Sequence, residues 1–231
     1  MNNLNQLEGR IGVSFKKKEL LEQALVHRSY LNENPGYRLD QNERLEFLGD
    51  AVLELVTTEH LYERFPEKPE GELTNLRAAL VNAEMLGEVA IELGLNDYLL
   101  LSRGEAKDTG RGRQYILANA FEAVIGAIYL DQGYAASREF VTRELLEKKL
   151  DQVLATKAYR DPKSHFQEEA QERAGITPTY EVLQEWGPDH AKNFRVGVFL
   201  GAEKVAEGVG PSKQEAQEVA AREALKEKGW S

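Results

Sequence analysis

One short segment combines acidic side chains with an otherwise apolar helix pattern. In residues 42–56, Glu43, Glu46 and Asp50 are spaced so that they share one stripe of a helix. Most other positions are apolar, which is typical of a buried helix. Buried carboxylates need a counter-charge, and Arg44 points away from the stripe. The stripe therefore predicts a divalent cation, although a solvated helix face with salt bridges to other helices would give the same spacing.

A second apolar segment carries a matching polar stripe. In residues 116–130, Asn119 and Glu122 are three positions apart on one side of the expected helix. Gly49 and Gly126 lack side chains, so two helix backbones can approach closely at these points. A crossing there would gather the carboxylate and amide oxygens of both stripes. Hard oxygen ligands of this kind suit Mg²⁺ or Mn²⁺.

These side chains must be positioned by long helices, which the apolar periodicity predicts in the first two thirds of the chain. Helices are expected over residues 18–26, 41–65, 76–95 and 136–154, with a further helix starting near residue 72 and loops over 32–41 and 99–113.

The two acidic segments are similar to a known family. Residues 42–50 (NERLEFLGD) resemble the signature of the ribonuclease III family, and residues 119–131 (NAFEAVIGAIYLD) resemble its second acidic motif. The resemblance implies an all-α endonuclease domain that works as a homodimer in the cytoplasm. It also implies Mg²⁺-dependent cleavage of double-stranded RNA, with Mn²⁺ as a possible substitute and no small-molecule cofactor. The expected products carry 5′-phosphates and short 3′ overhangs, as in the processing of rRNA, mRNA and other RNA.

The family motif also implies roles for individual residues. Metal ligands are expected at Glu46, Asn119 and Glu122, and catalytic roles at Asp50, Glu122 and Glu43. Glu54 extends the acidic stripe by one turn, but the family motif has no acid there, so it is not included.

Asn119 departs from the resemblance, because the family usually has Asp at this position. Asparagine keeps a carbonyl oxygen but lacks the full negative charge, so affinity for Mg²⁺ should fall. The change is compatible with a working natural variant, with an inactivating engineered change, or with a protein that only binds double-stranded RNA. We favour the working variant, because the other acids of the motif are present.

Three further positions allow both a functional and a structural interpretation. Glu70, in a Glu-Gly stretch that resembles the family's, is either an accessory residue of the active site or an acid favoured by a helix N-terminus. His27 is expected to end an apolar helix as a hydrogen-bonded structural residue rather than a catalytic one. The basic, glycine-rich loop 99–113 could hold phosphate or could merely be solvated.

Composition limits the possible functions. The chain has 29 Lys and Arg against 39 Asp and Glu, a net charge of −10, which by itself argues against a nucleic-acid partner. It has no cysteine, which excludes disulfides and thiolate chemistry and is compatible with a reducing compartment. No apolar run is long enough to span a membrane, and no secretory signal is expected.

The pattern changes near Pro162. We expect a catalytic domain over residues 1–155, a linker over 156–161 and a small α+β domain over 162–231 with the order α-β-β-β-α. This order and the loops GPDHAK (187–192) and GPSKQEA (210–216) resemble a double-stranded-RNA-binding domain. The RNA contacts implied by the resemblance are Gln167, Glu168, His190, Ser212 and Lys213.

This second domain should bind RNA only modestly on its own. From Asp161 onward it has nine Lys and Arg against thirteen Asp and Glu, and Gln214 and Gln217 stand where basic residues are common in the family. Ser212 could equally be a plain N-cap, since Ser212 and Glu215 form a capping box. Binding should depend steeply on salt.

Overall fold

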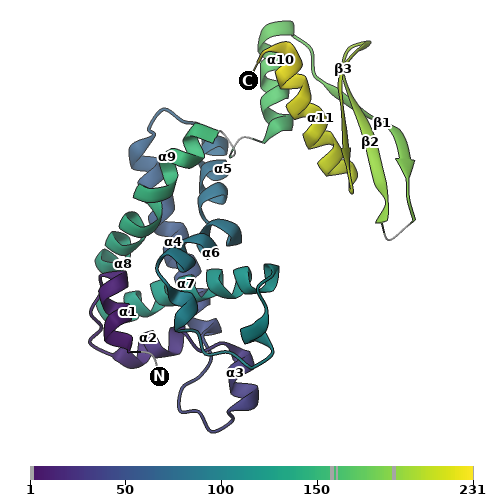
Figure 1. Ribbon diagram of the computed structural model, residues 1–231. Helices are drawn as coiled ribbons and strands as arrows, with labels where there is room; N and C mark the ends of the chain where they lie inside the picture. The colour runs from purple at the N-terminus through teal and green to yellow at the C-terminus, as the bar shows by residue number, and fades with distance from the viewer. Residues whose placement is uncertain (1–2, 157–158, 160, 189–190, 231) are drawn as a thin grey trace. The chain divides into compact units, whose positions relative to one another are not determined.

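The computed structural model describes residues 3–156, 159, 161–188 and 191–230, and it divides into two compact units, Met1–Tyr159 and Arg160–Ser231 (Figure 1). The first unit is helical and the second is α+β, so the expected fold class is confirmed. The expected linker 156–161 spans the division between the units, and its residues 157, 158 and 160 lie outside the described ranges.

The helices of the first unit follow the apolar periodicity, but several are shorter than expected, and the one expected over 116–130 is longer, since it begins at Arg111 inside the expected loop 99–113. They are α1 (Leu4–Ile11), α2 (Lys18–Ala24), α3 (Arg28–Glu33), α4 (Glu43–Arg64), α5 (Glu70–Leu80), α6 (Ala83–Glu92), α7 (Arg111–Gln132), α8 (Tyr134–Val141) and α9 (Glu147–Thr156). Short 3₁₀ turns cover Leu95–Asp97 and Glu105–Lys107, and a π-helical turn, Thr142–Leu146, joins α8 to α9.

One expected helix is interrupted. The helix predicted over 76–95 is wrong as a single element, because the chain breaks between α5 and α6. Asn82 starts α6 as its N-cap, and its side-chain oxygen accepts a hydrogen bond from the Met85 N–H at 3.0 Å. An Asn cap satisfies a backbone N–H that would otherwise lack a partner at a helix start.

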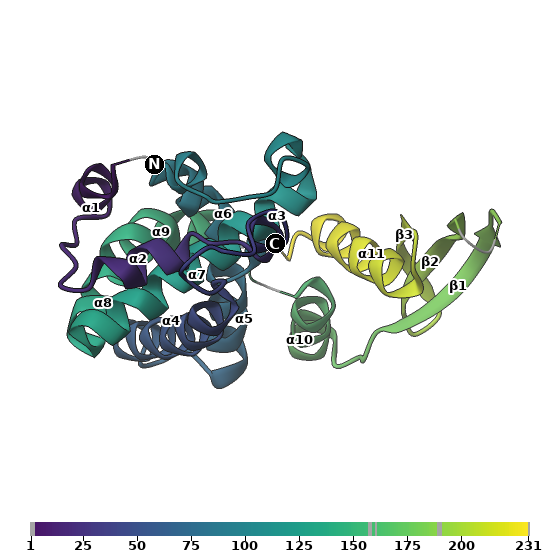
Figure 2. The ribbon, with the colours of Figure 1, turned by 90° about the horizontal axis from the view of Figure 1, so that it is seen from below.

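The central pair of the first unit is α4 and α7, but the two helices are buried to different degrees. In α7, every residue from Ile116 to Ile128 is buried except Asn119 and Glu122. Figure 2 shows α4 at the edge of the unit, alongside α5 and α8, whereas α7 lies inside.

The expectation that α4 is buried almost all round is therefore wrong. Its buried side includes Leu53 and Val56, which are fully inaccessible, but Phe47 is 81% exposed, Leu55 56% and Tyr62 74%. These three large apolar residues leave one side of α4 without a partner within the chain.

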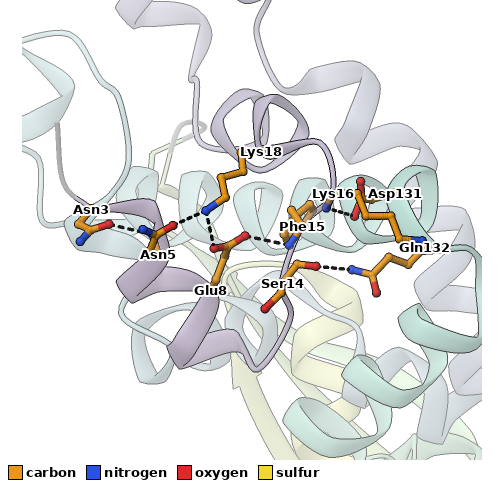
Figure 3. A network of polar contacts seen from close by, with 9 residues as sticks. All are labelled: Asn3, Asn5, Glu8, Ser14, Phe15, Lys16, Lys18, Asp131 and Gln132. Carbon is orange, nitrogen blue, oxygen red and sulfur yellow. Dashed lines mark hydrogen bonds and ion pairs between the residues drawn. The ribbon is translucent and has the colours of Figure 1, made fainter.

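The N-terminal segment is fastened to the end of α7 by side chains that accept backbone hydrogen bonds (Figure 3). The Asp131 carboxylate accepts from the N–H groups of Lys16 and Lys17, both at 2.8 Å. The buried Glu8 carboxylate accepts from the Phe15 N–H at 2.8 Å and from Lys18 Nζ at 3.1 Å. The contacts of Asp131 fix the C-terminal end of the helix that carries Asn119 and Glu122, and those of Glu8 hold the N-terminal segment that Asp131 contacts.

The second unit packs two helices on one antiparallel sheet. Its elements are α10 (Pro162–Ala174), β1 (Thr179–Trp186), β2 (Asn193–Leu200), β3 (Glu203–Gly210) and α11 (Lys213–Lys228), and the strand order is β1-β2-β3. Phe166, Val198 and Ala220 lie in its core. A Cβ on Gly208 would lie 2.2 Å from the Ala216 carbonyl oxygen, so glycine there lets α11 lie directly on β3.

Candidate active site

The site begins where α4 and α7 touch backbone to backbone. A Cβ on Gly49 would lie 1.7 Å from the Glu122 carbonyl oxygen, and a Cβ on Gly126 would lie 2.2 Å from the Leu45 carbonyl oxygen. No side chain fits at either position, so the contact requires two glycines. Because the helices meet here, the polar stripe of α4 faces that of α7.

Glu122 is the most perturbed acid of this cluster. Burial first, and then the negative charges of Asp50, Glu46 and Glu54, together raise its pKa to about 8. Within the described residues, Glu122 forms no ion pair that would offset these effects. A carboxyl group with neighbours of the same sign loses its proton readily only when a cation is present.

Glu46 lies beside Glu122 and contacts Asn119. Burial and the charges of Glu43 and Asp50 raise the pKa of Glu46, while a hydrogen bond from the Asn119 side chain works in the opposite direction. The amide therefore donates to the carboxylate where the family's usual Asp would repel it. Asp50 is exposed to solvent at the mouth of the cluster.

The two ends of the acidic stripe have basic partners from other helices, which inspection of α4 alone could not reveal. Arg28 Nη1 lies 3.8 Å from a Glu43 oxygen, and Gln41 donates a hydrogen bond to the same carboxylate at 3.0 Å. At the other end, Arg77 Nε lies 2.8 Å from Glu54 Oε2. The alternative of salt bridges to other helices thus holds at the ends of the stripe, but not at Asp50 among the residues that the structure describes.

The donor set fits a hard divalent cation, although the cluster is open. Glu46, Asp50, Asn119 and Glu122 supply carboxylate and amide oxygens, and the mutual repulsion at Glu122 is relieved by positive charge. In the part of the chain that the structure covers, no group of three or more His, Asp or Glu side chains is already close enough to hold a metal ion. To hold a metal ion, the cluster would therefore need the side-chain oxygen of Asn119 and a rotation of its acidic side chains.

Glu70 is the first residue of α5 and also borders a groove. Its carboxylate accepts a hydrogen bond from Thr74 Oγ1 at 2.9 Å, which fits the expected acid at a helix N-terminus. It also lines a groove of about 400 Å³ with Arg77 and Tyr62, so the accessory role remains a prediction. Sequence inspection missed Arg77, because its relation to Glu54 depends on how α5 lies against α4.

His27 has a structural position that differs from the expected one. It does not end a helix, since α2 ends at Ala24; it is the N-cap of α3. Its Nδ1 accepts a hydrogen bond from the Ser29 N–H at 3.3 Å and lies 2.8 Å from Ser29 Oγ. Burial lowers the pKa of His27, so a neutral ring that caps a helix accounts for it without a catalytic role.

The expected RNA contacts of the second unit lie on helix surfaces or outside the described residues. Gln167 and Glu168 are exposed on α10. Ser212 is the N-cap of α11 and accepts from the Glu215 N–H at 3.1 Å, and the exposed Lys213 has its Nζ 5.7 Å from the Phe194 ring centre. His190 lies outside the described residues.

In the described ranges no helix is both long and apolar enough to cross a membrane.

Comparison with known proteins covers nearly the whole chain. The Ribonuclease-III-like family model matches residues 17–149, and the double-stranded RNA binding motif matches residues 162–228. Ribonuclease 3 of Nitratiruptor sp. is 45% identical over 98% of this chain and 97% of its own length. Ribonuclease 3 of Desulforamulus reducens is 47% identical over 96% of this chain and 89% of its own length.

A solved structure agrees with these relatives. The nuclease domain of ribonuclease III from Campylobacter jejuni, described for structural flexibility in a region involved in dimer formation, is 40% identical. It matches 64% of this chain and 99% of its own length, with a TM-score of 0.58. Together with the two acidic stripes crossing at Gly49 and Gly126, these matches show that the chain belongs to the ribonuclease III family.

Proposed function

We propose that this protein is an endoribonuclease that hydrolyses phosphodiester bonds in double-stranded RNA with a divalent metal ion. Its products would carry 5′-phosphates and short 3′ overhangs, in the processing of rRNA and other RNA. The observation that carries the proposal is the close crossing of α4 and α7, which sets Glu46 and Asp50 against Asn119 and Glu122. Relatives named Ribonuclease 3 support the same activity.

Glu46, Asn119 and Glu122 would hold the metal ion, directly or through water. We propose Mg²⁺, with Mn²⁺ as a substitute, because both accept the oxygen ligands that these side chains offer. When bound, such an ion lowers the pKa of a water molecule, neutralises phosphate oxygens and stabilises the leaving alkoxide.

The chain's own residues control charge and proton position in the site. With its pKa near 8, Glu122 keeps a proton at neutral pH while the cluster lacks a counter-charge, and it releases that proton when positive charge arrives. Asp50, exposed beside it, would orient water at the scissile phosphate. Glu43 is restrained by Arg28 and Gln41 at the outer end of the stripe, where it would meet the RNA.

The second unit would hold the duplex by its shape. The minor groove of A-form RNA displays 2′-hydroxyls, which polar side chains can contact without reading sequence. Gln167, Glu168 and His190 are the proposed minor-groove contacts. Ser212 and Lys213 are the proposed phosphate contacts, since they lie at the start of α11, where free backbone N–H groups attract anions.

Cleavage of both strands requires two sites, and we propose that a symmetric homodimer supplies them. Phe47 projects from α4 and is 81% exposed. It borders a groove of about 590 Å³, whose other lining residues are the apolar Leu20, Leu45, Leu48 and Leu130 and the polar Gln23, Glu43 and Arg44. A two-fold axis at this face would place each Phe47 against the partner's groove. We also propose that the enzyme acts in the cytoplasm, since its cysteine-free chain suits a reducing compartment.

Labelled duplex RNA tests the proposal. Cleavage should require Mg²⁺ and stop in EDTA, and Asp50→Asn should lower the rate by at least about a hundredfold while leaving a gel shift intact. A protein that shifts duplex RNA but never cuts it would favour the binding-only alternative raised by Asn119. The relatives reported above give that alternative no support, because they are named Ribonuclease 3.

A further inference from the structure

A second groove opens next to the catalytic carboxylates, between α4 and α5. Its volume is about 400 Å³. One wall is contributed by α4 and the other by α5 and the turn before it. Its lining residues are Thr58, Leu61, Tyr62, Lys68, Glu70, Leu73, Thr74 and Arg77.

The acidic stripe of α4 leads directly into this groove. Asp50, Glu54, Thr58 and Tyr62 follow one another at four-residue intervals, so they form a continuous stripe that slants gradually around the helix from the acids to the groove. Thr58 is eight residues from Asp50, a distance of about 12 Å along the helix axis. An RNA strand whose scissile phosphate lies at Asp50 therefore reaches the groove within the first few nucleotides.

Arg77 joins the stripe to the groove. Its Nε lies 2.8 Å from Glu54 Oε2, and its Nη1 donates a hydrogen bond to Thr58 Oγ1 at 2.9 Å. A guanidinium has five N–H donors in a fixed fork, so donors on Nη1 and Nη2 remain for another acceptor. The Arg77 side chain is about one-third exposed, which leaves it accessible from the groove.

Tyr62 provides the apolar part of the same groove. Its ring is 74% exposed at the rim, although it belongs to a helix whose opposite side is fully buried. An aromatic ring beside a cation is a common combination for contacts to the sugar and phosphate of a nucleotide.

We propose that the groove between α4 and α5 seats the RNA strand that flanks the scissile bond, with Arg77 contacting one phosphate and Tyr62 packing against the adjoining ribose. This inference rests on the proposed endoribonuclease activity. It assigns substrate contacts to two residues outside the acidic motifs, and it gives Glu54 the task of holding the Arg77 guanidinium at the end of the stripe.

The decisive comparison is between Glu54→Gln and the double variant Glu54→Gln with Arg77→Gln. The single variant removes the carboxylate that pairs with Arg77, so the second change no longer breaks an ion pair. It removes the proposed contact to RNA together with the hydrogen bond to Thr58, which carries no net charge and does not alter the salt slope. Binding of duplex RNA is measured in EDTA over a range of salt concentrations. Loss of one phosphate contact lowers the slope of log K against log salt by about 0.9, so two grooves of a dimer would lower it by up to about 1.8.

Two further variants keep the test informative if the double variant folds poorly. Arg77→Lys keeps a charge that can reach phosphate, and it should retain most of the wild-type slope. Tyr62→Ala should weaken binding roughly fivefold with little change in slope, because it removes apolar contact rather than charge.

The outcomes separate the inference from the activity on which it rests. Equal slopes and affinities for Glu54→Gln and the double variant, with Tyr62→Ala binding like wild type, would overturn the inference while cleavage by the wild type continues. A change in oligomer mass for Tyr62→Ala, with unchanged RNA affinity, would make the groove a contact between subunits and also overturn it. A wild-type protein that neither binds nor cuts duplex RNA would instead remove the proposed function.

Discussion

At the scale of single residues, the carboxyl group of Glu122 favours the folded state when it is protonated but must lose its proton to bind a metal ion. Burial first, and then Asp50, Glu46 and Glu54, raise its pKa to about 8 in the folded chain. A carboxyl whose pKa rises on folding favours the folded state only while it is protonated. The metal-free protein should therefore lose stability as pH rises from about 4.5, the unfolded value, toward 8.

Glu122→Gln should remove this dependence. In EDTA, raising the pH from 5 to 8.5 should increase the free energy of unfolding of the variant by roughly 1–2 kcal/mol relative to that of wild type, once solvent screening is allowed for. Urea unfolding at both pH values measures the difference. Glu43→Gln is the matched control, because Glu43 is exposed and paired with Arg28. If the two variants show the same change in stability with pH, the clustered charges do not govern the pKa of Glu122.

Asn119→Asp should change metal affinity and metal-free stability in opposite directions. The new carboxylate replaces an amide that donates to Glu46, so repulsion should lower the free energy of unfolding in EDTA by about 1 kcal/mol. The added charge should tighten Mn²⁺ binding, measured by calorimetry, by several-fold. Unchanged Mn²⁺ affinity would mean that the side chain at 119 is not a ligand.

Residue spacing along one helix was predictable, and so was the helix crossing marked by glycines, but side-chain contacts between helices were not. The stripes on α4 and α7 follow from helical periodicity, and the two glycines predicted the crossing that the structure has. The pairing of Arg77 with Glu54 depends on how α5 lies against α4. The cap formed by His27 is local and follows from α2 ending at Ala24, before its apolar pattern ends. The exposure of Phe47 was not predictable from an apolar pattern that fits a core equally well.

At the scale of elements, the crossing of α4 and α7 leaves no space for a side chain. Gly49→Ala places a Cβ 1.7 Å from the Glu122 carbonyl oxygen, and a backbone atom in a packed helix cannot move away cheaply. We expect the free energy of unfolding to fall by about 1–3 kcal/mol or more. The cleavage rate should also fall strongly, since the helices that carry the acids must separate.

Gly71→Ala provides a matched control for that change. Gly71 lies in α5, and a Cβ there would meet no atom within 4 Å. Because alanine favours a helix more than glycine, this variant should gain about 0.5–1 kcal/mol in thermal or urea unfolding and keep its activity. Equal effects at both positions would argue against backbone contact at Gly49.

At the scale of the whole molecule, a chain with a net charge of −10 must bind a polyanion. Its second unit is itself acidic, so attraction by basic residues cannot supply all of the affinity. Pairing two chains would place two second units and two metal clusters on one duplex, and the joint contacts would raise affinity without further positive charge. Dimer formation is therefore tied to RNA binding as well as to cutting both strands.

The end of this exposed side of α4 that carries Phe47 should form the dimer contact, whereas Tyr62 at its other end borders the groove assigned to RNA. Phe47→Asp places a charge where an apolar ring would be buried by the partner, so analytical ultracentrifugation should find monomers at concentrations where wild type is dimeric. Ile91→Ala is the control, since Ile91 on α6 is also an exposed large apolar residue, at 57%. Cleavage per chain by Phe47→Asp should fall at least about tenfold and recover partly at high protein concentration, because mass action restores pairs. A variant that stays dimeric and cuts both strands like wild type would move the subunit contact away from this side of α4.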